Sequence, residues 1–136
     1  MTTKVSALIS EENYQLWYGG VWKGGDFFGT WYAGRFVKGT FQGPWKGGVW
    51  QDGEFLGSAW QDGEWRKGKW HKGKWYRGNW KSGIWKNGEW SSGTWDYGEW
   101  LNGDWISGVW HNGTWYKGYW HTGLWKKGSW MSGVWV

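Results

Sequence analysis

From residue 17 onward, aromatic residues recur at about every fifth position, and the positions between them are mostly polar or Gly. From Trp60 to Trp135 the Trp spacing never varies, and a Gly follows three residues after the Trp in each unit from Gly63 to Gly133. A fixed period indicates units that cannot bury their apolar faces alone, so a core must come from stacking neighbours. The pattern predicts a repeat protein.

Two all-β folds fit a five-residue period. In a β-solenoid, Gly-x-Trp is one side of a coil: Trp points inward, the preceding residue points outward, and Gly leaves room for a neighbouring indole. In a curled antiparallel meander, three-residue strands centred on Trp alternate with two-residue turns. The dipeptides Asn87-Gly88 and Asp52-Gly53 favour type I′ hairpin turns, which support the meander.

Two observations favour the solenoid. The units at 27–31 and 41–45 each lack one residue between the aromatic residue and Gly, and a solenoid corner tolerates this loss whereas a two-residue hairpin turn does not. A similar segment also recurs at 80–85, 105–110 and 130–135, a spacing of 25. We therefore expect a β-solenoid of pentad repeats with inward Trp and about five units per coil.

A coil of five units predicts which side chains meet between coils. Opposite charges or hydrogen-bonding partners would stack in adjacent layers and help to set the register. The expected contacts join Lys74 with Glu99, Asp96 with His71 and His121, and Asp52 with Arg77. Each buried indole N–H also needs an acceptor, and we expect backbone carbonyls at the corners to provide it.

The register Gly-x-Trp-x-x resembles the pentapeptide-repeat family, whose units place a small residue two positions before a central Leu or Phe and wind a four-sided solenoid. Here Trp and Gly replace the usual residues, and the larger inward groups suggest a wider coil. The segment 97–103, with the sequence YGEWLNG, is weakly similar to MORN repeats, which are hairpin units of scaffold proteins. The whole tract most resembles Trp/Gly pentad-repeat (WxxGx) proteins of uncharacterised phage and bacterial type, a resemblance that implies little chemistry.

Composition agrees with an aromatic core. The chain has 136 residues, including 21 Trp, 5 Phe and 27 Gly, and its Gly residues are in phase with Trp. It divides into a non-repetitive N-terminal arm or cap at 1–16 and a repeat domain at 17–136. There is no Cys, which excludes disulfides and thiolate metal sites.

No segment resembles a targeting or membrane sequence. The apolar run at the N-terminus is too short for a signal peptide, and no stretch approaches the roughly 20 apolar residues of a membrane helix. We expect a protein that is soluble where it is made, with a virion or a surface assembly as possible locations.

Catalytic residue types are present but not arranged as a site. Ser82 and Ser91 occupy corner or outward positions, and in a five-unit coil His111 and His121 point apart. Carboxylates such as Asp52 and Glu54 flank a Gly with no expected cleft. The sequence predicts no enzyme, no catalytic residue, no cofactor and no metal site.

A basic belt is the strongest charged feature. Eight of the sixteen Lys and Arg residues lie between Glu64 and Glu89, with no acidic residue among them. They are Arg66, Lys67, Lys69, Lys72, Lys74, Arg77, Lys81 and Lys86. Basic side chains interleaved with exposed aromatic rings are typical of single-stranded nucleic acid sites, and exposed Trp rows also stack on sugars. A solenoid would hide the rings, and the belt would then keep the rod soluble or meet an acidic neighbour.

Aliphatic residues at outward positions form a second candidate surface. In a five-unit coil they would align at one corner as an assembly stripe: Leu56, Ala59, Ile84, Ile106, Val109, Met131 and Val134. A contiguous apolar strip usually marks an interface. Alternatively, the N-terminal segment covers it, through Val5, Leu8, Ile9 and Leu16.

The repeat remains regular up to Trp135 and Val136, which predicts an open end. The first sixteen residues would plug the first coil or seat on the next subunit. We therefore expect a structural assembly protein that self-associates end to end or laterally, as a rigid subunit of a filament, fibre, appendage or virion. The alternative is a binding module for glycans or single-stranded nucleic acid that uses aromatic and basic surface.

Overall fold

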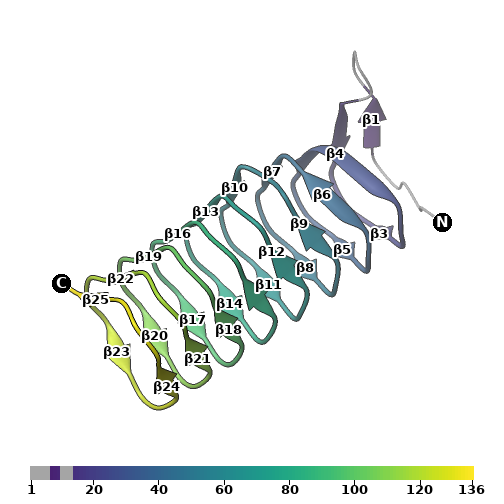
Figure 1. Cartoon of the computed structure of the whole chain (residues 1–136). Coiled ribbons are helices and arrows are strands. Elements are labelled where there is room, and N and C mark those ends of the chain that lie inside the picture. The colour runs from purple at the N-terminus through teal and green to yellow at the C-terminus, as the bar shows by residue number, and fades with distance from the viewer. Residues whose placement is uncertain (1–6, 10–13) are drawn as a thin grey trace.

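The computed structural model describes residues 7–9 and 14–136, and within them the protein is an all-β solenoid of about eight turns (Figure 1). All strands from β2 onward pair in parallel with strands of neighbouring coils. Among the described strands, the one antiparallel pair joins β1 (Ala7–Ile9) to β2 (Gln15–Trp17) before the regular coils begin. The solenoid is confirmed, and the antiparallel meander is wrong.

Each coil has three sides, which we name faces A, B and C in chain order. Face A contains β2, β7 (Pro44–Trp45), β10 (Ala59–Trp60), β13 (Lys74–Trp75), β16 (Glu89–Trp90), β19 (Asp104–Trp105), β22 (Tyr119–Trp120) and β25 (Val134–Trp135). Face B contains β3 (Val21–Trp22), β5 (Arg35–Phe36), β8 (Val49–Trp50), β11 (Glu64–Trp65), β14 (Asn79–Trp80), β17 (Thr94–Trp95), β20 (Val109–Trp110) and β23 (Leu124–Trp125). Face C contains β6 (Thr40–Gln42), β9 (Glu54–Phe55), β12 (Lys69–Trp70), β15 (Ile84–Trp85), β18 (Glu99–Trp100), β21 (Thr114–Trp115) and β24 (Ser129–Trp130), and β4 (Asp26–Trp31) runs from face C into face A.

The coil closes after three units, so the predicted five units per coil were wrong. Trp85 pairs with Trp70 and Trp100, fifteen residues away on either side, and not with Trp110. The physical reason is the size of the core, because three inward indoles already fill the centre of a triangle. A ring of five would leave a void on the axis, and protein interiors do not keep large voids.

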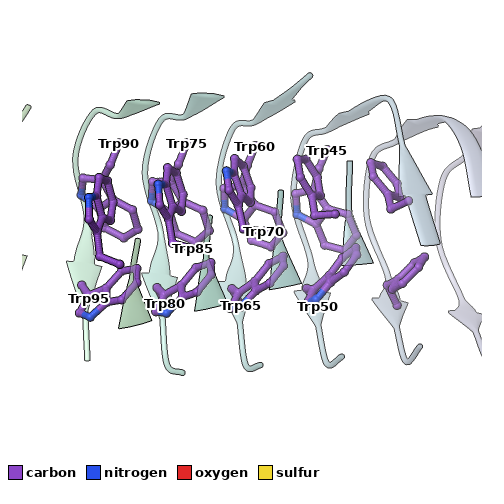
Figure 2. Packing of buried hydrophobic residues seen from close by; sticks show 14 of the residues in the cluster. Trp45, Trp50, Trp60, Trp65, Trp70, Trp75, Trp80, Trp85, Trp90 and Trp95 are labelled. Carbon is purple, nitrogen blue, oxygen red and sulfur yellow. The ribbon is translucent and has the colours of Figure 1, made fainter. Parts of the chain in front are cut away.

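The indoles make two kinds of contact. Within a coil they meet edge to face: the ring centroids of Trp75 and Trp80 are 5.9 Å apart with an interplanar angle of 71°. Between coils they stack in parallel, and Trp75 lies 4.7 Å from Trp90 at 6°. Both geometries are favourable for aromatic pairs, and 4.7 Å is the spacing of neighbouring strands. Figure 2 shows the resulting columns, which leave every inward ring from Trp17 to Trp120 at most 3% exposed.

Corners join the faces, and they are named AB, BC and CA. At a typical corner the backbone bonds to the coil before it: the N–H of Tyr76 donates to the carbonyl of Trp60 at 2.8 Å, and the N–H of Asn79 donates to that of Gly63 at 3.0 Å. Four Asp or Asn side chains accept a hydrogen bond from the N–H of the Gly that follows: Asp52, Asp62, Asn87 and Asn112. The Asx-Gly dipeptides therefore build solenoid corners, and not hairpin turns.

Corner Gly residues are fixed by the stacking of backbones. Gly98 has φ +137°, and a Cβ added there would overlap the carbonyl oxygen of Gly83 in the preceding coil and lie 3.2 Å from the indole nitrogen of Trp80. The expectation that Gly makes room for an indole is therefore incomplete. The closest neighbour of this Gly is the backbone of the equivalent corner in the preceding coil.

Corner carbonyls accept the indole N–H groups, as expected, for eight Trp residues. In each case the acceptor lies 17 residues further on, as in the bond from Trp65 Nε1 to the carbonyl of Ser82 at 3.1 Å. The other donors in this group are Trp50, Trp75, Trp85, Trp90, Trp95, Trp105 and Trp110. Ten buried indoles, including Trp80 and Trp100, have no hydrogen-bond partner among the described residues.

Candidate functional surfaces

On each face the residue before the Trp points outward and the Trp points into the core. The stacked Trp rings of residues 17–120 are therefore absent from the outer surface. The exposed aromatic side chains in this part of the chain are Phe28 and several Tyr residues. Tyr18 and Tyr32 stack with ring centroids 5.0 Å apart. Tyr97 at corner BC and Tyr119 on face A are 57% and 51% exposed. A surface row of Trp for stacking on bases or sugars is therefore not formed.

The basic belt winds around the whole rod. Arg66, Lys67 and Lys81 lie at corner BC, and Arg77 lies at corner AB. The other four continue around the rod: Lys69 on face C, Lys74 on face A, and Lys72 and Lys86 at corner CA. The belt covers more than one coil because a coil contains three units and not five.

Acidic residues of neighbouring coils pair with much of the belt. Lys81 is 3.4 Å from Asp96, Arg77 is 3.3 Å from Asp62, and Lys74 is 3.9 Å from Glu89. Lys67 is 4.0 Å from Asp52. All four pairs are fifteen residues apart, which is one coil. Along the rod, a basic band thus lies between two acidic bands. Each exposed ion pair contributes about 0–1 kcal/mol to the stability of the fold.

The contacts expected from a 25-residue coil do not form. Lys74 pairs with Glu89 and not Glu99, and Asp96 pairs with Lys81 and not with His71 or His121. His71 Nε2 instead lies 3.0 Å from Glu54 Oε1. Asp52 meets Lys67, and Arg77 meets Asp62. The four Lys and Arg pairs between coils follow the three-unit register, whereas His71 and Glu54 are 17 residues apart.

The histidines lie at three different corners: His71 at CA, His111 at BC and His121 at AB. Within residues 7–9 and 14–136, no three His, Asp or Glu side chains are grouped as metal ligands.

The predicted assembly stripe is dispersed over the rod. Ala59 and Val134 lie on face A, Val109 on face B and Ile84 on face C, because a shift of 25 residues moves a position to another side. Leu56 and Met131 lie at corner CA, and Ile106 lies at corner AB. Because the stripe does not form, there is no stripe for the N-terminal segment to cover. Leu8 pairs with Leu16 between β1 and β2, and Ile9 pairs with Gln15. Val5 falls outside the described residues.

The last described coil is the most exposed part of the rod. Trp135 and Val136, the predicted open end, are 62% and 64% exposed. Three outward aliphatic residues surround this coil on different sides: Leu124 on face B, Met131 at corner CA and Val134 on face A. We name these three residues the apolar collar.

Shallow grooves follow two of the corners, and sequence analysis missed them. Each groove has a column of corner Gly residues as its floor, because Gly has no side chain to fill the space. At corner CA one groove, of about 440 Å³, has Gly73, Gly88 and Gly103 as its floor. At corner BC smaller ones lie over Gly53, Gly68 and Gly83. The regular Gly spacing could have predicted them if the three-unit coil had been known.

No protein-family model matches the chain, and no curated protein or solved structure is significantly similar to it. The resemblance to pentad-repeat proteins therefore extends only to a repeat solenoid with a Trp at about every fifth residue. A membrane-spanning helix is absent from the described part of the chain.

Proposed function

We propose that this protein is a structural assembly module: a rigid rod that serves as a subunit of a filament, fibre, appendage or virion. The observation that carries this proposal is the continuous aromatic core. Each internal indole stacks on rings in both neighbouring coils and meets two more in its own coil, so bending the rod would separate many contacts at once. Eight turns at about 4.8 Å each give a rod about 38 Å long.

The outer surface also supports a structural role. Its basic and acidic bands are largely paired with each other, and this leaves less free positive charge for a polyanion than the sequence suggested. Nucleic-acid binding by base stacking has no Trp platform in residues 17–120.

The apolar collar is the surface that we assign to assembly. Leu124, Met131 and Val134 are 53%, 63% and 49% exposed. Each of the three exposes apolar area on a different side of this coil, and a contact that buries these side chains would remove that area from water.

Sedimentation velocity over a wide concentration range, with negative-stain imaging at the highest concentration, tests the proposal. We expect association that rises with concentration and particles of constant width. The triple variant Leu124→Lys, Met131→Lys and Val134→Lys should stay monomeric. A matched control adds the same charge elsewhere on exposed positions, with Asn79→Lys, Ser92→Lys and Tyr116→Lys, and should still associate. A wild-type chain that is monomeric at every concentration would contradict the assembly role.

A further inference from the structure

The groove at corner CA differs from the rest of the surface in the chemistry of its walls. One wall is a column of amides, Asn87 and Asn102, and the other is a column on face A that contains Glu89, Asp104 and Tyr119. Its volume of about 440 Å³ lies in the range of small-molecule sites, although it is open to solvent.

Several polar side chains of this groove, Asn102 and Asp104 among them, have no hydrogen bond or ion pair within the described residues. Asn87 caps the N–H of Gly88 at 2.9 Å, but the side chain of Asn102, in the same position one coil later, makes no hydrogen bond within the described residues. Asp104 likewise has no ion pair there, whereas Glu89 is paired with Lys74. Both free side chains are half-buried beside the Gly floor. A hydrogen-bonding ligand would find one amide and one carboxylate available.

The register also places like charges together at this groove. Glu89 and Asp104 are direct neighbours in the parallel ladder, whereas four Lys or Arg side chains of the belt meet an opposite charge one coil away. Adjacent like charges are unfavourable by about 0.2–1 kcal/mol. A pair of like charges in adjacent strands, which destabilises the fold, often has a functional reason.

Charge and shape together select the class of ligand. Lys72 and Lys74 balance Glu89 and Asp104, so the groove has no net charge and favours a neutral ligand. The strands beside it are already paired on both sides, as in β19 with β16 and β22, so a peptide cannot add as a strand. The walls offer no aliphatic pocket for a peptide anchor, but they do offer hydrogen-bonding groups and the exposed ring of Tyr119.

We infer that the groove at corner CA binds a neutral linear polysaccharide lying parallel to the rod axis. The Asn102 amide and the Asp104 carboxylate hydrogen-bond to sugar hydroxyls, and the Tyr119 ring stacks on the apolar face of a sugar. An amide and a carboxylate recur in two successive coils, Asn87 with Glu89 and Asn102 with Asp104, which suits a ligand of repeating sugars. This role is independent of the proposed assembly function, which uses the collar.

Affinity gel electrophoresis tests the inference with three separate neutral probes: hydroxyethyl cellulose, soluble starch and galactomannan. We expect at least one probe to retard the full-length protein in proportion to its concentration. Asn102→Ala and Tyr119→Ala should each weaken that retardation about tenfold.

Matched controls lie at corner BC. Tyr97→Ala removes an exposed Tyr, and Asn112→Ala removes an Asn from the same corner position, but neither residue belongs to the groove at corner CA. Circular dichroism confirms that each variant is folded. The inference is overturned if no probe retards the protein, or if the control variants lose as much binding as the groove variants.

Discussion

The first coils and the later coils of this rod have the same aromatic core, but the first coils contain one residue fewer. Trp17, Trp31 and Trp45 of face A pair at intervals of fourteen residues, whereas Trp60, Trp75 and Trp90 pair at intervals of fifteen. The missing residue is always at corner CA, where the two shortened units lie one coil apart. The aromatic triads are therefore the constant feature, and corner length is the variable one.

Both shortened corners follow a Phe and not a Trp, although a Phe at position 55 precedes a full-length corner. The rings that precede the shortened corners are Phe27 and Phe41, whose centroids lie 5.5 and 5.6 Å from the next ring. In a full-length coil the equivalent pair, Trp85 and Trp90, is 5.9 Å apart. A shorter corner brings the two sides closer together, so less space remains for the inward ring.

The largest expected effect concerns what both regions share, the corner Gly. Gly98→Ala should destabilise the protein by about 2–6 kcal/mol, because it combines left-handed backbone strain with an overlap on the Gly83 carbonyl. Gly47→Ala is the control: a Cβ there would lie 3.5 Å from the Tyr32 carbonyl, an ordinary contact, without left-handed strain. Urea denaturation measures both, and equal losses would show that stacking of corners is not the cause.

The second prediction exchanges ring sizes between regions. Phe41→Trp should cost about 1–3 kcal/mol, because an indole overfills the side next to a shortened corner. Phe55→Trp should cost less, since a full five-residue unit follows Phe55 and its ring is already 6.2 Å from Trp60. Thermal melting of the two variants distinguishes them. A more stable Phe41→Trp variant would refute the link between corner length and ring size.

The third prediction separates stacking from hydrogen bonding inside the fifteen-residue coils. Trp90→Phe removes a bond from the indole N–H to the Ser107 carbonyl at 3.1 Å, whereas the indole N–H of Trp80 has no partner among the described residues. Trp90→Phe should therefore cost about 1 kcal/mol more than Trp80→Phe. Chemical denaturation of the two variants provides this difference, and identical losses would mean that these bonds add nothing.

The smallest expected effect on stability concerns the ion pairs between neighbouring coils. Lys81→Glu places a like charge beside Asp96 and should cost about 0.2–1 kcal/mol at low salt. Adding Asp96→Lys should restore stability, because the swapped pair again stacks one coil apart. A double variant no better than the single one would indicate that register does not depend on this contact.

Some of this architecture could be predicted from the sequence for clear physical reasons. The alternation of Gly, an outward residue and Trp is enough to predict an inward aromatic core and parallel coils. The shortened units correctly favoured corners over hairpin turns. The residues 1–16 and 17–136 remain a predicted division.

The number of sides was missed because similar outward residues were taken as the repeat. Segments such as 80–85 and 105–110 resemble each other in Ser-Gly-aliphatic-Trp, but outward residues contribute little to pairing. Better signals were available: the shortened units are fourteen residues apart, and Lys67, Arg77 and Lys81 each have an opposite charge fifteen residues away. The grooves could not be predicted, since they depend on which corners stack.

The central claim is that three units close one coil, and disulfide formation between introduced cysteines tests it most directly, because the chain has no native Cys. Thr94 and Val109 are direct neighbours on face B, and Cα atoms in adjacent strands lie within the range that a disulfide spans. The variant Thr94→Cys, Val109→Cys should form an intramolecular disulfide under mild oxidation without loss of stability. Ile84→Cys, Val109→Cys, 25 residues apart on different faces, should remain reduced. A disulfide in the second variant but not in the first would contradict the three-sided solenoid.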